Sequence, residues 1–222
     1  MSSLEDRYSK IQHILKSYPK AKLLAVSKYT SDENIQTLYD LGHRDFGENR
    51  VPELVERASR FPRDMNWHFI GNIQSNKINK LFQVEGLCAI HSIDRISILE
   101  KILRSQPIRK IDLYLQVNTS GESEKAGFEK ISEVIEAIKK FKASKNNSFQ
   151  LKGLMTMAAI RTDDYLSDAR LSFEKLVEMR KQIQSQFPDL DFELNMGMSR
   201  DYQLALELGS QLIRVGSTLF DG

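Results

Sequence analysis

Short apolar runs alternate along the chain with longer segments in which apolar residues recur every three or four positions. Such runs are typical of strands buried on both faces of a sheet, and the longer period is typical of amphipathic helices. The pattern predicts eight strands, at residues 23–26, 44–46, 67–70, 87–91, 111–117, 151–155, 192–195 and 212–215. A clear helical segment follows each strand but the last.

A further helix is expected before the first strand. Leu4, Tyr8, Ile11 and Leu15 are spaced as one face of a helix. After the first strand, Ser31 is placed to cap the start of the next helix by accepting a hydrogen bond from a backbone amide.

Strict alternation of strands and helices requires parallel strands with crossover helices. Eight such units close naturally into a (β/α)₈ barrel, and 222 residues lie at the short end of that fold's size range. An open doubly wound sheet is the alternative, but it usually has fewer strands and often a glycine-rich first turn, which residues 23–34 lack. No change in composition marks a linker, so we expect a single domain spanning residues 1–222.

Composition and charge exclude several classes of protein. A net charge of only +2 indicates no nucleic-acid or acidic-membrane surface. Cys88 is the only cysteine, so an intrachain disulfide is impossible. The N-terminus has no apolar core of a signal peptide, and no apolar run approaches the ~18 residues of a transmembrane helix. We therefore expect a soluble, cytoplasmic protein.

In a barrel, functional side chains lie at the C-terminal ends of the strands. Lys28 stands at that end of the first strand, in the stretch LLAVSKYT. An amine in this place can form a Schiff base with a carbonyl compound. Its stem can equally pack while its head reaches water, so this stretch alone leaves both interpretations open.

Two other strand ends carry phosphate-binding features. Ser199 lies in NMGMSRDY at an expected helix start, and Gly216 and Ser217 follow the last strand in IRVGST. Barrels often bind phosphate with the loops after strands 7 and 8, although each stretch alone could be an ordinary turn and cap. Together with Lys28, these stretches indicate an aldehyde that carries a phosphate, and pyridoxal phosphate is the obvious candidate.

Arg214 and His68 are the remaining candidates. Arg214 stands in the last strand among apolar residues, where it either pairs with a carboxylate or donates to the pyridine nitrogen of the cofactor. In the second case the ring stays unprotonated and is a weak electron sink. His68 either points into the barrel near a ligand or is structural. The histidines show no metal-ligand spacing, so we expect no metal.

Taken together, the motifs resemble the YggS/PROSC family of pyridoxal phosphate homeostasis proteins. They run in order over nearly the whole chain: AVSKYT, FGENRVPEL, WHFIGNIQSNK, HSID, VNTSGESEKAGF, GLMTMA, MGMSRDY and IRVGSTLF. The resemblance implies a barrel similar to the N-terminal domain of alanine racemase. It also implies roles for six residues: Lys28 as the Schiff-base lysine, Asn49 beside the cofactor, Arg214 near the ring nitrogen, and Ser199, Gly216 and Ser217 around the phosphate. Asn195 departs from the family, which usually has serine there.

Racemisation needs a base on each face of the cofactor. Lys28 could be one, but the alanine racemases that the barrel resembles take the second from a tyrosine of a separate domain, and this chain ends at Gly222. We therefore expect a monomeric carrier of pyridoxal phosphate without robust catalysis, which buffers the cofactor and delivers it transiently to apo-enzymes. A fold-type III amino-acid racemase and a barrel that binds sugar phosphates are the alternatives.

Overall fold

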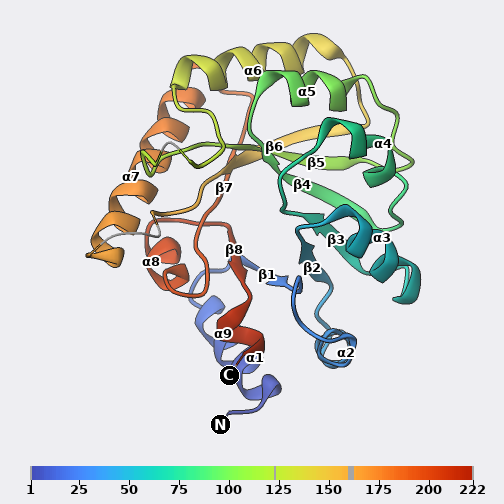
Figure 1. The fold of residues 1–222 in the computed structure, drawn as a ribbon. Coiled ribbons are helices and arrows are strands. Elements are labelled where there is room, and N and C mark those ends of the chain that lie inside the picture. Colours follow the sequence, from blue (N-terminus) through green and yellow to red (C-terminus); the bar gives the residue numbers. More distant parts are fainter. Residues whose placement is uncertain (1, 123, 160–162, 222) are drawn as a thin grey trace.

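The computed structural model describes residues 2–122, 124–159 and 163–221, and within these residues eight parallel strands form a closed barrel (Figure 1). Each strand pairs with the next, and β8 closes the ring on β1. The strands are β1 (Lys22–Val26), β2 (Asp45–Glu48), β3 (Asn66–Phe69), β4 (Leu87–Ile93), β5 (Ile111–Gln116), β6 (Phe149–Met155), β7 (Glu193–Asn195) and β8 (Leu212–Val215). The predicted (β/α)₈ barrel is confirmed, and the open sheet is excluded.

Helices surround the barrel on its outer side (Figure 1). They are α1 (Leu4–Leu15), α2 (Asp32–Asp40), α3 (Val51–Arg60), η1 (Ser75–Lys77), α4 (Ile78–Leu81), α5 (Ile96–Leu103), α6 (Ile131–Ser144), α7 (Tyr165–Gln186), α8 (Tyr202–Glu207) and α9 (Ser217–Phe220). The expected N-terminal helix and the Ser31 cap are confirmed, since the Ser31 side chain accepts a hydrogen bond from the backbone amide of Asn34. The sequence pattern missed α9, because a four-residue helix is too short to show a helical period.

Helix α1 holds the C-terminal end of the chain in place. In Figure 1, α1 and α9 lie side by side near both termini. The guanidinium of Arg7 donates hydrogen bonds to the carbonyl oxygens of Leu219 (2.7 Å) and Phe220 (3.3 Å). The N-terminal helix therefore anchors the segment that follows β8.

Alternation along the strands divides the apolar residues into two clusters. Leu23 and Ala25 point outward into a large cluster beneath the helices, whereas Leu24 points inward. The inner cluster combines buried residues from five strands: Leu24, Ala89, Tyr114, Met155 and Leu212. Burying a leucine side chain contributes about 1.5–3 kcal/mol, so both layers stabilise the closed barrel.

Among the described residues, none of the helices combines the length and apolar character needed to cross a bilayer. The same part of the chain contains no group of three or more His, Cys, Asp or Glu side chains arranged to hold a metal ion.

Candidate functional site

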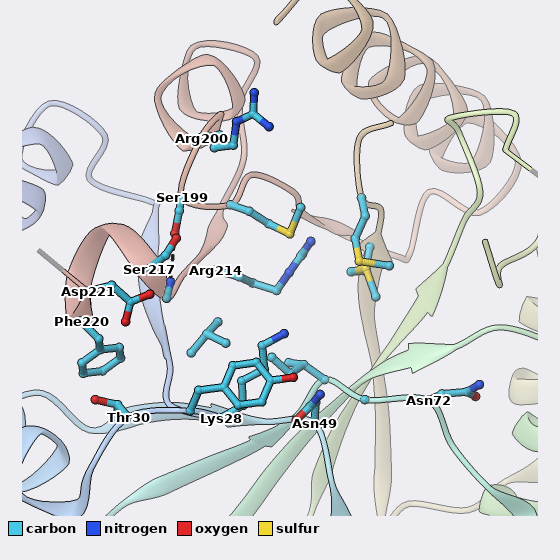
Figure 2. A pocket seen from close by; sticks show the side chains of 18 of the residues that line it. Lys28, Thr30, Asn49, Asn72, Ser199, Arg200, Arg214, Ser217, Phe220 and Asp221 are labelled. Carbon is cyan, nitrogen blue, oxygen red and sulfur yellow. Dashed lines mark hydrogen bonds between the residues drawn. The ribbon is translucent and has the colours of Figure 1, made fainter. Parts of the chain in front are cut away.

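A cavity of about 630 Å³ opens at the C-terminal ends of the strands. All six residues proposed from the sequence line it: Lys28, Asn49, Ser199, Arg214, Gly216 and Ser217. Figure 2 shows Lys28 and Asn49 on one side of the cavity and Ser199 and Ser217 on the other. The structure thus brings together residues that come from four separate strand ends.

Lys28 lies in the turn that follows β1 and has an exposed side chain. Its ammonium lies 5.1 Å from the centroid of the Tyr29 ring, and it forms no ion pair within the described part of the chain. The neighbouring Ser27 is fully buried, and its hydroxyl donates a 2.6 Å hydrogen bond to Oε1 of Glu48. The backbone of the turn is therefore held in place by Ser27, while the Lys28 side chain is exposed at the cavity.

Arg57, which sequence reasoning missed, clasps the same turn from α3. Its NH1 donates to Oε1 of Glu48 and to the carbonyl oxygen of Ser27, both at 2.5 Å, and its NH2 donates to the carbonyl oxygen of Thr30 at 2.5 Å. Burial raises the pKa of Glu48, and the hydrogen bonds from Ser27 and Arg57 oppose that effect. No local spacing in the sequence links Arg57 to Lys28.

The loops after β7 and β8 meet at the hydroxyl of Ser199. Its Oγ accepts hydrogen bonds from the backbone amides of Gly216 and Thr218, both at 3.2 Å. The hydroxyl of Thr218 donates back to the carbonyl oxygen of Ser199 at 3.0 Å. A Cβ added to Gly216 would lie 3.3 Å from the carbonyl oxygen of Val26, so this loop packs closely on β1. Backbone amides and hydroxyls, which are good phosphate donors, therefore gather at one edge of the cavity.

Arg214 is buried and reaches the cavity from β8. Its NH1 donates to the carbonyl oxygen of Asn195 (3.0 Å), and its NH2 donates to that of Thr156 (2.8 Å). Burial lowers the pKa of Arg214 to about 10, and the carboxylate of Asp201 opposes this shift. The guanidinium remains charged at neutral pH. In the described residues, its hydrogen-bond partners are amide oxygens rather than the carboxylate that the alternative interpretation required.

Asn49 follows β2 directly, and its backbone is in close contact with Gly71. A Cβ on Gly71 would lie 1.8 Å from the carbonyl oxygen of Asn49. The loop after β3 can approach Asn49 this closely only because residue 71 lacks a side chain.

Comparison with known proteins identifies the family. The model for the alanine racemase N-terminal domain matches residues 1–222. The pyridoxal phosphate homeostasis protein of Schizosaccharomyces pombe is 38% identical over 200 residues, which cover 89% of this chain and 82% of that protein. This chain belongs to the pyridoxal phosphate homeostasis protein family. The family member of Mus musculus is 36% identical over 211 residues, which cover 90% of this chain and 76% of that protein.

A solved structure extends the family likeness to three dimensions. PipY of Synechococcus elongatus PCC7942, solved with PLP bound, is 31% identical and superposes with a TM-score of 0.85. The match covers 98% of this chain and all of PipY (100%). Both the family resemblance of the sequence motifs and the alanine-racemase-type barrel are therefore confirmed.

Proposed function

We propose that this homeostasis-family chain binds pyridoxal phosphate in the cavity as a Schiff base on Lys28, and that it buffers and delivers the cofactor in the cytoplasm without robust catalysis. One observation carries the proposal: a single cavity is lined by a lysine ammonium that has no ion pair among the described residues, by a buried arginine, and by the hydroxyls of Ser199 and Ser217. PipY, which has the same barrel, was solved with PLP bound.

The residues of the cavity fit the parts of this cofactor. Bound pyridoxal phosphate supplies an aldehyde that reacts with amines. The neutral amine of Lys28 adds to the aldehyde carbon, and water leaves as the C=N bond forms. Ser199 and Ser217 offer hydroxyls to the phosphate, and Gly216, which has no side chain, lets the backbone of the loop approach it closely.

Two further residues act on the ring. Arg214 donates to the ring nitrogen without giving up its proton, which keeps the ring a weak electron sink. Asn49 lies beside the ring on the Lys28 side of the cavity. In this role the chain acts as a monomer, and its contacts with recipient apo-enzymes are transient.

The alternative is an amino-acid racemase, since the chain matches the model of the alanine racemase N-terminal domain. It needs a second base opposite Lys28. Tyr165 lines the cavity, but its hydroxyl donates a 2.6 Å hydrogen bond to Asp201, and burial together with Asp201 raises its pKa. Tyr29 is 78% exposed and lies beside Lys28. The hydrogen bond from Tyr165 to Asp201 holds that hydroxyl away from the role of a second base, which favours the carrier.

The test combines trapping with isotope exchange. Purified protein is titrated with pyridoxal phosphate, reduced with borohydride and mapped by peptide mass spectrometry. In parallel, the loaded protein is incubated with α-deuterated amino acids. The proposal expects an adduct on Lys28 and no deuterium loss over many turnovers. Repeated loss of deuterium would establish the racemase, and the absence of any adduct would leave only a phosphate-binding barrel.

A further inference from the structure

A continuous chain of hydrogen bonds leads from the cavity through the barrel interior to the opposite mouth. Arg214 NH1 donates to Oδ1 of Asn195. Asn195 Nδ2 lies 2.5 Å from His91 Nδ1, His91 Nε2 lies 2.8 Å from His68 Nδ1, and His68 Nε2 lies 3.2 Å from Asp45 Oδ1. The five side chains come from β8, β7, β4, β3 and β2, so the chain ties together strands far apart in sequence.

Chemistry sets the direction of every bond in this chain. A guanidinium can only donate, so the amide oxygen of Asn195 must face Arg214 and the amide nitrogen must face His91. That NH₂ group donates, so Nδ1 of His91 accepts and carries no proton. A neutral His91 then has its proton on Nε2 and donates to His68, whose own Nε2 proton is directed to Asp45. The chain therefore runs one way, from a cation to a carboxylate, through two neutral imidazoles.

Burial and packing agree with this arrangement. His91 and Asn195 are fully buried, and the His91 ring stacks on Tyr114 with the centroids 4.5 Å apart. Burial lowers the pKa of His91 well below its usual value, and the charge of Arg214 acts in the same direction. Burial tends to raise the pKa of Asp45, but hydrogen bonds from His68 and Asn66 bring it below the usual value, so this end of the chain is a carboxylate.

Two opposing effects act on the charge of His68. Burial lowers its pKa, whereas the charges of Cys88 and Asp45 raise it to about 10. A second proton on His68 would sit on Nδ1 and face the Nε2 proton of His91. The hydrogen-bond directions therefore favour a neutral His68.

We propose that Asn195 is a positioning residue: held in one orientation by the His91–His68–Asp45 chain, it fixes the guanidinium of Arg214 at the cavity. The inference rests on the proposed function, because Arg214 is the residue expected at the ring nitrogen. A long arginine side chain needs such fixing to present one N–H at a defined place. At the position where the family usually has serine, Asn195 accepts from Arg214 through its amide oxygen and donates to His91 through its amide nitrogen.

The first experiment measures the protonation of His91 and His68 in the cofactor-free protein. In protein labelled with ¹⁵N-histidine, NMR at pH 7 should show His91 and His68 both neutral and protonated on Nε2. Asn195→Asp removes the donor opposite His91, so the proton of His91 should move to Nδ1. Asn146→Asp is the matched control, because among the described residues the Asn146 amide donates to the carbonyl oxygens of Leu103 and Ser105 and to no histidine. A His91 proton on Nδ1 in the original protein, or no change in Asn195→Asp, would overturn the proposal.

The second experiment reads the cofactor itself. Asn195→Leu keeps the side-chain size but removes both hydrogen bonds of the amide. With ¹⁵N-labelled pyridoxal phosphate, we expect the ring-nitrogen resonance to move and the affinity to fall about tenfold. Asn195→Asp, which still accepts from Arg214, should retain the original ring-nitrogen shift. An unchanged resonance in folded Asn195→Leu would overturn the positioning role. Failure of the original protein to bind the cofactor would instead refute the proposed function. The histidine spectra would still test the hydrogen bonds between Asn195, His91 and His68.

Discussion

Arg57 donates a 2.5 Å hydrogen bond to the buried carboxylate of Glu48. The same guanidinium holds the carbonyl oxygens of Ser27 and Thr30, which flank the Lys28 turn on both sides. Its ion pair with Glu48 is largely shielded from solvent, since the Arg57 side chain is only 13% exposed. Lys28 is thus exposed, yet the backbone of its turn is held at two points by one residue.

The first prediction concerns this clasp. Arg57→Lys should slow the formation of the Schiff base on Lys28 and lower the free energy of unfolding by about 1–3 kcal/mol, because a single ammonium cannot replace a fork that donates to three oxygens. Stopped-flow absorbance and urea unfolding measure the two effects. Arg60→Lys on the same helix is the control, since Arg60 is half-exposed and pairs with Asp32 and Glu56. Equal rates in both variants would refute the clasp.

The second prediction is that Lys28→Ala leaves a folded barrel that yields no borohydride-stable adduct. The side chain is exposed and forms no ion pair among the described residues, so its loss should cost little stability. Peptide mapping after reduction detects the adduct, and circular dichroism reports the fold. Lys16→Ala, at an exposed position just after α1, should label like the original protein. Labelling that persists in Lys28→Ala would assign the reaction to another lysine.

The third prediction tests the phosphate side of the cavity. Ser199→Ala should weaken the binding of pyridoxal phosphate by about 1–3 kcal/mol, the expected value of a hydrogen bond to a charged group. Fluorescence titration gives the affinity. Ser59→Ala removes an exposed hydroxyl that donates to the carbonyl oxygen of Glu56 and does not line the cavity, so it should leave the affinity unchanged. If Ser199→Ala binds as tightly as this control, Ser199 does not hold the phosphate.

Local patterns predicted most of the fold and the residues that line the cavity. A strand buried on both faces is a short apolar run, so its end can be located in the sequence, and Lys28, Ser199 and Gly216 were found as polar or small residues just beyond such ends. The closed barrel then had to bring those ends together. The predicted strand bounds were less accurate: β2 runs from Asp45 to Glu48, whereas the sequence pattern predicted a strand over residues 44–46.

Contacts across the barrel could not be predicted in this way. His91 and Asn195 are 104 positions apart, and they meet only because the registers of β4 and β7 place both side chains inside the barrel at compatible heights. Arg57 likewise reaches Ser27 from a helix 30 residues later. Such partners depend on strand register and helix placement, for which a single sequence carries no local signal.

The fourth prediction concerns the close approach of two loops. Gly71→Ala should weaken cofactor binding and cost about 1–3 kcal/mol of stability, because its Cβ would collide with the backbone of Asn49 and overpacking is expensive. Gly47→Ala is the control, since its Cβ would make ordinary 3.4 Å contacts with Ile70 and Leu24. Thermal unfolding and titration compare the two variants. Similar behaviour of both would mean that the Asn49 loop can yield without cost.

The fifth prediction is a loss of stability on mild acidification. Burial lowers the pKa of His43, although its hydrogen bond to the carbonyl oxygen of Asp45 opposes the shift, and the pKa of buried His91 is lowered as well. In the unfolded chain both titrate near the ordinary histidine value of about 6.5. Below that pH the unfolded state binds more protons than the folded state, so the free energy of unfolding decreases as the pH falls. The stabilisation is complete above about pH 6.5 and is lost as the pH drops through the folded pKa values.

His43→Phe isolates one of these two contributions. The His43 ring packs edge-on against Tyr8 and Phe46, so phenylalanine can occupy the same site without a titratable group. Urea unfolding of the cofactor-free protein between pH 5 and pH 7 should show a shallower slope for His43→Phe. His13→Phe replaces an exposed histidine and should keep the original slope. If His43→Phe also keeps it, His43 takes up its proton in the folded protein as readily as in the unfolded chain.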